Sequence, residues 1–238
     1  MQNIHKKNES FFALMWIAVY VIGISTADGL SEEFGILKVF TLPVALVLSF
    51  FLYGWIRKNK LQQYYGLRRI TSIDFRKYLY FLPLLVLSTA NFWNSAVFEH
   101  SFLETALFIT SMLFIGFLEE VIFRGFLFKA LSRKSIRSAL IISSVTFGMG
   151  HIVNLLNGAD FFPTLLQIGY ATAIGFLFTV LFIKTKSLWP GILAHAVINA
   201  TSLFAVEGDG FVQLVSSLVM VVLSVGYALY LLRIVPEN

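Results

Sequence analysis

Two adjacent acids, Glu119 and Glu120, lie inside the apolar run 105–131 and are followed by Arg124. A charged side chain near the centre of a bilayer costs roughly 2.5 to 3.5 kcal/mol, so these residues must face the interior of a protein bundle. Glu120 and Arg124 are four residues apart and can pair on one face of a helix. Glu119 lies about 100° around that helix and cannot use Arg124 equally. We therefore predict Glu119 as a general base and the Glu120–Arg124 pair as its support, although a helix-packing role without catalysis remains the alternative.

Two histidines follow in later apolar runs. His151 lies at a depth comparable with that of Glu119, and a carboxylate and an imidazole that share one water form a hydrolytic arrangement. His195 and Asn199 are four residues apart and share a helix face, where side-chain donors can stabilise a developing oxyanion. Two alternatives remain open. Glu119, His151 and His195 can instead ligate zinc with an open position for water, or these polar groups only bond helices to one another.

The composition indicates the class of protein in which these residues lie. Of 238 residues, 58% are hydrophobic and 13% are charged, and the mean hydropathy is +0.80. These values are typical of an integral membrane protein. The absence of cysteine excludes disulfides and thiolate metal sites. The net charge of +5 comes from bases in short loops between apolar runs, which favours a topological cause over nucleic-acid binding.

About eight apolar runs are long enough for membrane-spanning helices, which need about 20 residues each. They are expected at 11–26, 36–56, 78–98, 105–131, 138–157, 164–183, 188–206 and 211–234. Alternate loops are basic and the others acidic, so the positive-inside rule places both termini in the cytoplasm. We predict an all-α polytopic membrane bundle. The first run also resembles a signal peptide, an alternative in which that helix is removed.

The chain is expected to divide into three parts. N-terminal transmembrane helices occupy 1–104, a catalytic core occupies 105–206, and a C-terminal transmembrane helix occupies 207–238. The basic segment 57–77 carries interleaved apolar residues, so it is predicted to lie on the anionic cytoplasmic leaflet of the lipid bilayer.

The site residues together resemble the motifs of a known family. They stand in order as EEVIFR from Glu119 to Arg124, FGMGH from Phe147 to His151, and HAVIN from His195 to Asn199. This pattern is similar to that of the CAAX prenyl endopeptidase and bacteriocin-processing family of intramembrane proteases, also called CPBP or Abi. The resemblance implies that Glu119 and His151 activate water and that His195 and Asn199 stabilise the oxyanion. Glu120, Arg124 and Phe147 would support them.

The resulting hypothesis is an intramembrane endopeptidase in a cavity that opens toward the cytoplasmic side. By the resemblance, its substrate is a peptide or membrane protein, its location is a bacterial plasma membrane, and its role lies in peptide or bacteriocin maturation, immunity or regulation. No cofactor is expected on the favoured mechanism, and zinc is the alternative. A non-catalytic bacteriocin-immunity or scaffold protein is the competing hypothesis. A proton-coupled transporter is a third, because intramembrane Glu and His residues also form proton relays.

Overall fold

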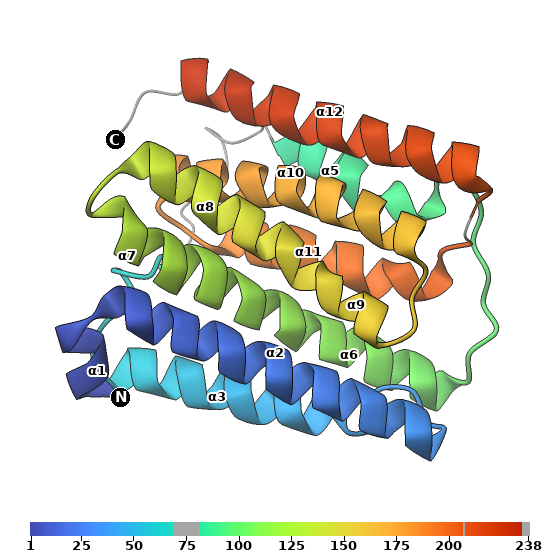
Figure 1. Ribbon diagram of the computed structural model, residues 1–238, viewed down its shortest axis with the longest axis horizontal. Coiled ribbons are helices and arrows are strands. Elements are labelled where there is room, and N and C mark those ends of the chain that lie inside the picture. The colour runs from blue at the N-terminus through green and yellow to red at the C-terminus, as the bar shows by residue number, and fades with distance from the viewer. Residues whose placement is uncertain (69–80, 207, 235–238) are drawn as a thin grey trace.

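Helices run side by side through the whole molecule in the computed structural model, which describes residues 1–68, 81–206 and 208–234 (Figure 1). Five helical segments of this part are long and apolar enough to cross a membrane. They are Glu9–Phe34, Phe102–Ser132, Ile136–Leu156, Phe161–Thr185 and Gly210–Arg233. The all-α, multi-pass membrane architecture predicted from the sequence is therefore confirmed.

Some long helical segments consist of several consecutive elements. In chain order, the elements are α1 (Gln2–Lys7), α2 (Glu9–Phe34), α3 (Thr41–Lys58), α5 (Leu82–Ser88), η2 (Ala90–Phe92), α6 (Phe102–Glu119), η3 (Glu120–Phe128), α7 (Lys129–Ser132), α8 (Ile136–Met149), η4 (Gly150–Ile152), α9 (Val153–Leu156), α10 (Phe161–Thr185), α11 (Trp189–Thr201), η5 (Ser202–Phe204) and α12 (Gly210–Ile234). The segment Phe102–Ser132, for example, consists of α6, η3 and α7.

Local sequence signals set several of these boundaries. The Asn8 side chain caps α2, which ends at Gly35 in the left-handed conformation with φ of 76°. Ser101 and Glu104 form a capping box that starts α6. The first predicted span, 11–26, is shorter than the helix that the structure shows, because α2 continues to Phe34.

Three other predicted spans differ from the structure. The run 36–56 corresponds to α3, which begins only at Thr41 and is not among the five segments long and apolar enough to cross a membrane. The run 188–206 contains a helix of only 13 residues, α11, followed by the short turn η5. The run 78–98 lies partly outside the described residues, and its described part holds α5 and η2. A total of eight spans and the orientation of the termini stay predictions.

The middle of the chain forms the centre of the bundle. α10 packs against α8 and α12, whereas α6 packs against α3 and α11, and α2 lies along η3 (Figure 1). The first two long helices therefore cover one side of the predicted core.

An aromatic cluster fills the end of the bundle where α2 begins. The ring centroid of Phe126 lies 5.1 Å from that of Phe12, 4.9 Å from Tyr65 and 6.2 Å from Trp55. Tyr65 is only 1% exposed. The described part of the basic segment 57–77 thus folds back into the bundle at Tyr65, while residues 69–77 lie outside the described chain.

His5 in α1 is tied to the same cluster. It is 8% exposed, and its Nε2 lies 2.5 Å from the Tyr65 hydroxyl oxygen. Desolvation lowers the pKa of His5 below its ordinary value of 6.5, although Glu9 opposes this shift. The unfolded chain therefore takes up this proton at a higher pH than the folded chain, so stability falls as the pH drops below 6.5.

We predict that His5→Gln weakens the pH dependence of stability. Between about pH 7.5 and about pH 5, the melting temperature of the wild type in detergent should fall more than that of the variant, because the variant has no proton to bind at this position. His100→Gln removes an exposed histidine and should retain the wild-type dependence. Equal pH dependence of wild type and His5→Gln would contradict this assignment.

Candidate active site

The helix that carries the two adjacent acids changes its geometry at them. α6 ends at Glu119, and the chain continues as a π-helix over Glu120–Phe128, in which every residue is buried. π-Helical turns bond residue i to residue i+5, are rare, and occur frequently at functional sites. Glu120 and Arg124 therefore lie on a π-helix, which is wider than the α-helix that the sequence analysis assumed.

A chain of polar contacts links both acids across three helices. Arg124 Nη1 lies 2.8 Å from Glu120 Oε1, which also lies 3.0 Å from His195 Nδ1. His195 Nε2 lies 3.1 Å from Glu119 Oε2, and the Tyr20 hydroxyl donates to Glu119 Oε1 at 2.7 Å. Both contacts of His195 are hydrogen bonds only if each ring nitrogen carries a proton. The two carboxylates then balance the charges of Arg124 and His195.

The predicted pairing of Glu120 with Arg124 is present in this chain of contacts. The pair is almost completely buried, with side chains 1% and 0% exposed. Among the described residues, Arg124 Nε and Nη2 have no hydrogen-bond partner, but the guanidinium lies 4.1 Å from the centroid of the Phe147 ring. An aromatic face attracts a desolvated cation. Phe147 therefore supports Arg124 by a cation–π contact.

Two glycines leave the space that this buried pair occupies. A Cβ atom at Gly191 in α11 would lie 2.9 Å from Glu120 Oε2, and one at Gly175 in α10 would lie 3.0 Å from Arg124 Nη2. Both distances are shorter than ordinary van der Waals contact. The glycines thus allow α10 and α11 to close over the pair.

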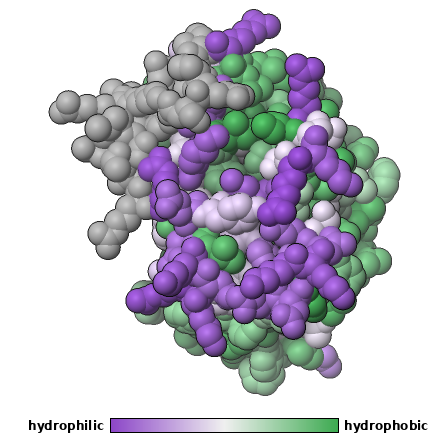
Figure 2. Space-filling view, turned by 90° about the vertical axis from the view of Figure 1, so that its left-hand side faces the viewer, coloured by the Kyte–Doolittle hydropathy of each residue, from purple (hydrophilic) through white to green (hydrophobic). Residues whose placement is uncertain are grey.

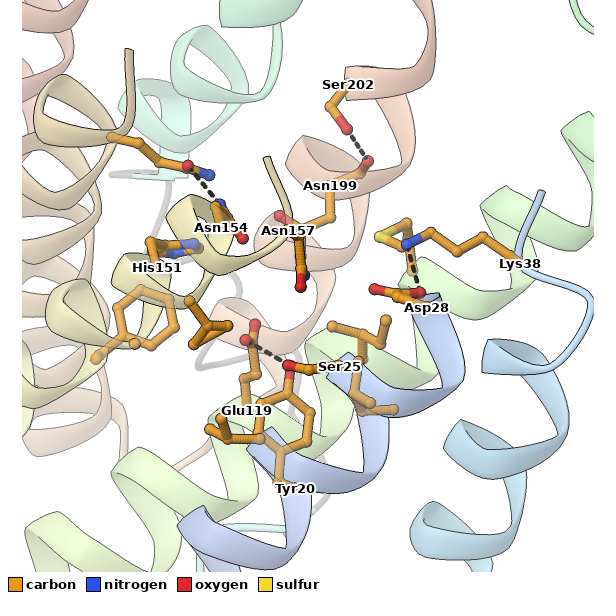
Figure 3. A pocket seen from close by; sticks show the side chains of 18 of the residues that line it. Tyr20, Ser25, Asp28, Lys38, Glu119, His151, Asn154, Asn157, Asn199 and Ser202 are labelled. Atoms are coloured by element: carbon orange, nitrogen blue, oxygen red, sulfur yellow. Dashed lines mark hydrogen bonds and ion pairs between the residues drawn. The ribbon is translucent and has the colours of Figure 1, made fainter. Parts of the chain in front are cut away.

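Glu119, His151 and Asn199 face a common cavity of about 350 Å³, which Tyr20 and Phe147 also line (Figure 3). His151 lies in the 3₁₀ turn η4, where α8 tightens before α9. Within the described chain, neither His151 nor the side-chain amide of Asn199 has a hydrogen-bond partner. A carboxylate, an imidazole and an amide are therefore available to a bound molecule.

The cavity lies away from the end where α2 begins. Its walls include Ser25 and Asp28 near the end of α2, Asn157 after α9, and Ser202 after α11 (Figure 3). The basic loops lie at the other end, which is packed around Phe126. The cavity thus lies at the end opposite the basic loops, which differs from the opening on the cytoplasmic side that the sequence analysis expected for the predicted orientation.

His195 occupies a different place from Asn199. It is 4% exposed and lies behind Glu119, outside the lining of the cavity. Both of its ring nitrogens face carboxylates, which leaves neither free for a zinc ion. In the described residues, no three His, Asp or Glu side chains are grouped so as to hold a metal. The alternative zinc set of Glu119, His151 and His195 does not fit this arrangement.

Comparisons with known proteins point to the same segment of the chain. Residues 101–201 match the family described as "Type II CAAX prenyl endopeptidase Rce1-like". This segment belongs to the Rce1-like family. A protein of Bacillus subtilis (strain 168) named "Putative membrane peptidase YdiL" is 42% identical over 83 residues, which cover 34% of this chain and 30% of that protein. The chain thus aligns with less than a third of that relative's length.

The Rce1-like segment contains every site residue predicted from the sequence, but it does not contain Tyr20. Tyr20 lies on α2 and has its hydroxyl on Glu119. A tyrosine in an apolar run is common in membrane helices, so the sequence carried no signal that distinguished it. Only the packing of α2 along η3 reveals its contact with the site.

Arg124→Ala should destabilise the protein by about 3 to 5 kcal/mol, because it leaves the buried Glu120 without its counter-charge. Thermal or denaturant unfolding in detergent would measure the change. Arg133→Ala is the matched control, since it breaks an ion pair with Glu9 in which the Arg133 side chain is 62% exposed. That change should cost at most about 1 kcal/mol. Equal losses in the two variants would argue against a buried ion pair as a structural requirement.

Proposed function

We propose that this multi-pass membrane protein is an intramembrane endopeptidase that hydrolyses a peptide bond of a peptide or membrane-protein substrate. The observation that carries the proposal is the shared cavity of Glu119, His151 and Asn199. A base, a second proton-binding group and an amide donor thus surround one space inside the bundle. The Rce1-like match and the similarity to the Bacillus subtilis protein support a peptidase of a bacterial cell membrane.

Glu119 and His151 hold the attacking water in this proposal. As the water oxygen bonds to the carbonyl carbon, its proton passes to the Glu119 carboxylate. The carbonyl oxygen becomes an oxyanion, to which Asn199 donates a hydrogen bond. When the tetrahedral intermediate collapses, the C–N bond breaks and Glu119 returns the proton to the leaving nitrogen. The products are a carboxylic acid and an amine, with Glu119 restored.

His195 has two successive tasks in the same proposal. In the resting site it holds Glu119 and Glu120 through its two ring nitrogens. A protonated Glu119 is a weaker acceptor than the carboxylate, because charge-assisted hydrogen bonds are roughly twice as strong as neutral ones. The bond from His195 Nε2 to Glu119 therefore weakens as the water loses its proton. The proposal requires the released His195 ring to turn from its place behind Glu119 toward the cavity, where it joins Asn199 at the oxyanion.

The proposed chemistry needs no cofactor, and no step passes through a metal. This part of the proposal rests on the fact that both ring nitrogens of His195 contact carboxylates. Cleavage by purified protein in the presence of a chelator is the direct test.

A non-catalytic immunity or scaffold protein is the alternative. Such a protein needs the buried Glu120–Arg124 pair for packing, but it does not need a carboxylate, an imidazole and an amide around one cavity. Protection against a toxin that survives Glu119→Gln would support this alternative.

Glu119→Gln should abolish proteolysis and leave the protein folded, because the amide retains the size of the side chain and removes the base. General acid–base catalysis contributes about 10²- to 10⁴-fold, so cleavage should fall at least by that range. Comparing membrane peptides of cells with wild-type and variant protein would measure the loss and name the substrate. Glu99→Gln changes an exposed acid and should cleave normally. An unchanged peptide profile in Glu119→Gln would reject the proposal.

Tyr20→Phe should lower kcat about tenfold with little change in KM or melting temperature. The hydroxyl holds Glu119 in place, and a hydrogen bond to a charged group contributes about 1.5 to 3 kcal/mol. Steady-state cleavage of the peptide that accumulates in the Glu119→Gln cells would provide both constants. Tyr53→Phe, on the exposed face of α3, is the control. Equal kcat values for the two variants would show that Tyr20 does not position the base.

A further inference from the structure

The cavity follows one face of each of two helices from mid-bundle to a single end. On α6 it is lined by Phe108, Met112, Ile115 and Glu119, which are spaced by three or four residues. Eleven residues of helix separate Phe108 from Glu119, a distance of about 16 Å at 1.5 Å per residue. Beyond Glu119 on this helix, the lining stops at Phe123. The path to the base therefore comes from the end at which α6 begins.

α2 provides the opposite wall and gives the same direction. Its lining residues begin at Tyr20 and continue toward the end of the helix as Val21, Ile24, Ser25 and Asp28. Between Tyr20 and the start of α2, the helix is packed instead, with Trp16 and Phe12 buried. The aromatic cluster around Phe126 fills the bundle on that side. The two walls thus define a well with one open end.

Charge distinguishes the two ends of the bundle. Hydrophilic side chains cover the end opposite the cavity (Figure 2), where the exposed bases are Lys6, Lys7, Arg57, Lys58, Lys60, Arg133, Lys134, Arg137, Lys186 and Arg233. At the cavity end, Lys38 is the one base among the described residues, and it pairs with Asp28 at 2.8 Å. The acids at that end are Asp28, Glu32, Glu33, Glu99, Glu104, Asp160 and Asp209. Lys and Arg in short loops face the cytoplasm.

We propose that the catalytic well opens on the non-cytoplasmic face of the membrane and takes a polypeptide that presents its scissile bond there, such as an exported peptide or the outer segment of a membrane protein. The substrate class rests on the proposed proteolytic function, whereas the direction of the well does not. Amide side chains of Asn154, Asn157, Gln167 and Asn199 line the well. Each carries both donors and acceptors, which match the backbone groups of an extended peptide.

The chain contains no cysteine, so single cysteines can report on each end without background. Ser25→Cys places a thiol inside the well with little change in shape. Glu33→Cys marks the surface at the same end, and Lys134→Cys marks the basic end; both positions are exposed. Intact cells would be treated with a charged, membrane-impermeant thiol reagent before and after permeabilisation. The thiols left unmodified would then be counted in the unfolded protein.

The cysteines at positions 25 and 33 should react in intact cells, and the cysteine at position 134 should react only after permeabilisation. The reverse pattern would overturn the proposal by placing the well on the cytoplasmic side. Reaction of position 33 without reaction of position 25 in intact cells would overturn it too, because the well would then be closed to the outside.

The labelling requires no catalysis, so its outcome does not depend on whether the protein is a protease. Labelling from outside together with unchanged membrane peptides in Glu119→Gln cells would support the direction of the well. The same result would reject both the proposed proteolysis and the substrate class. If both tests succeed, the peptides that accumulate in Glu119→Gln cells should be cleaved in segments outside the cytoplasm. Cleavage in cytoplasmic segments would overturn the proposed substrate class.

Discussion

The ion pair of Glu120 with Arg124 allows a second carboxylate to exist inside an apolar bundle. Two acids in adjacent positions repel each other, and burial removes the water that would otherwise screen them. Arg124 neutralises one acid, and His195 connects that acid to the other through its two ring nitrogens. Glu119 can therefore stay at the wall of a cavity, with its charge balanced from behind and its free side open to a ligand.

The site also depends on residues outside the Rce1-like segment 101–201. α2 lies along η3, contributes Tyr20 to the base and forms a wall of the well. The Rce1-like segment thus depends on an earlier helix for the shape of its site. This dependence also argues that α2 belongs to the folded bundle, as predicted, and against the alternative of a signal peptide that the first apolar run left open.

Apolar run length and helical spacing were enough to predict the five long apolar segments and the pairing of Glu120 with Arg124. The resemblance to a family also selected residues that the structure brings together. The π-helix at Glu120–Phe128, the short α11 and the contact of Tyr20 were not predicted, because each depends on packing between helices. Spacing placed His195 beside Asn199, but it could not show that the imidazole turns toward the acids and the amide toward the cavity.

The aromatic packing beneath the well has an electrical consequence. Water in the well has the electrical potential of the solution at its open end. Most of the membrane voltage therefore falls across the packed half of the bundle beneath the well. The rings of Phe126, Phe12, Trp55 and Tyr65 seal this half. One elementary charge that crosses 100 mV changes in energy by about 2.3 kcal/mol. The cluster thus acts as an insulator, which lets the site hold water deep in the membrane without forming a pathway for ions.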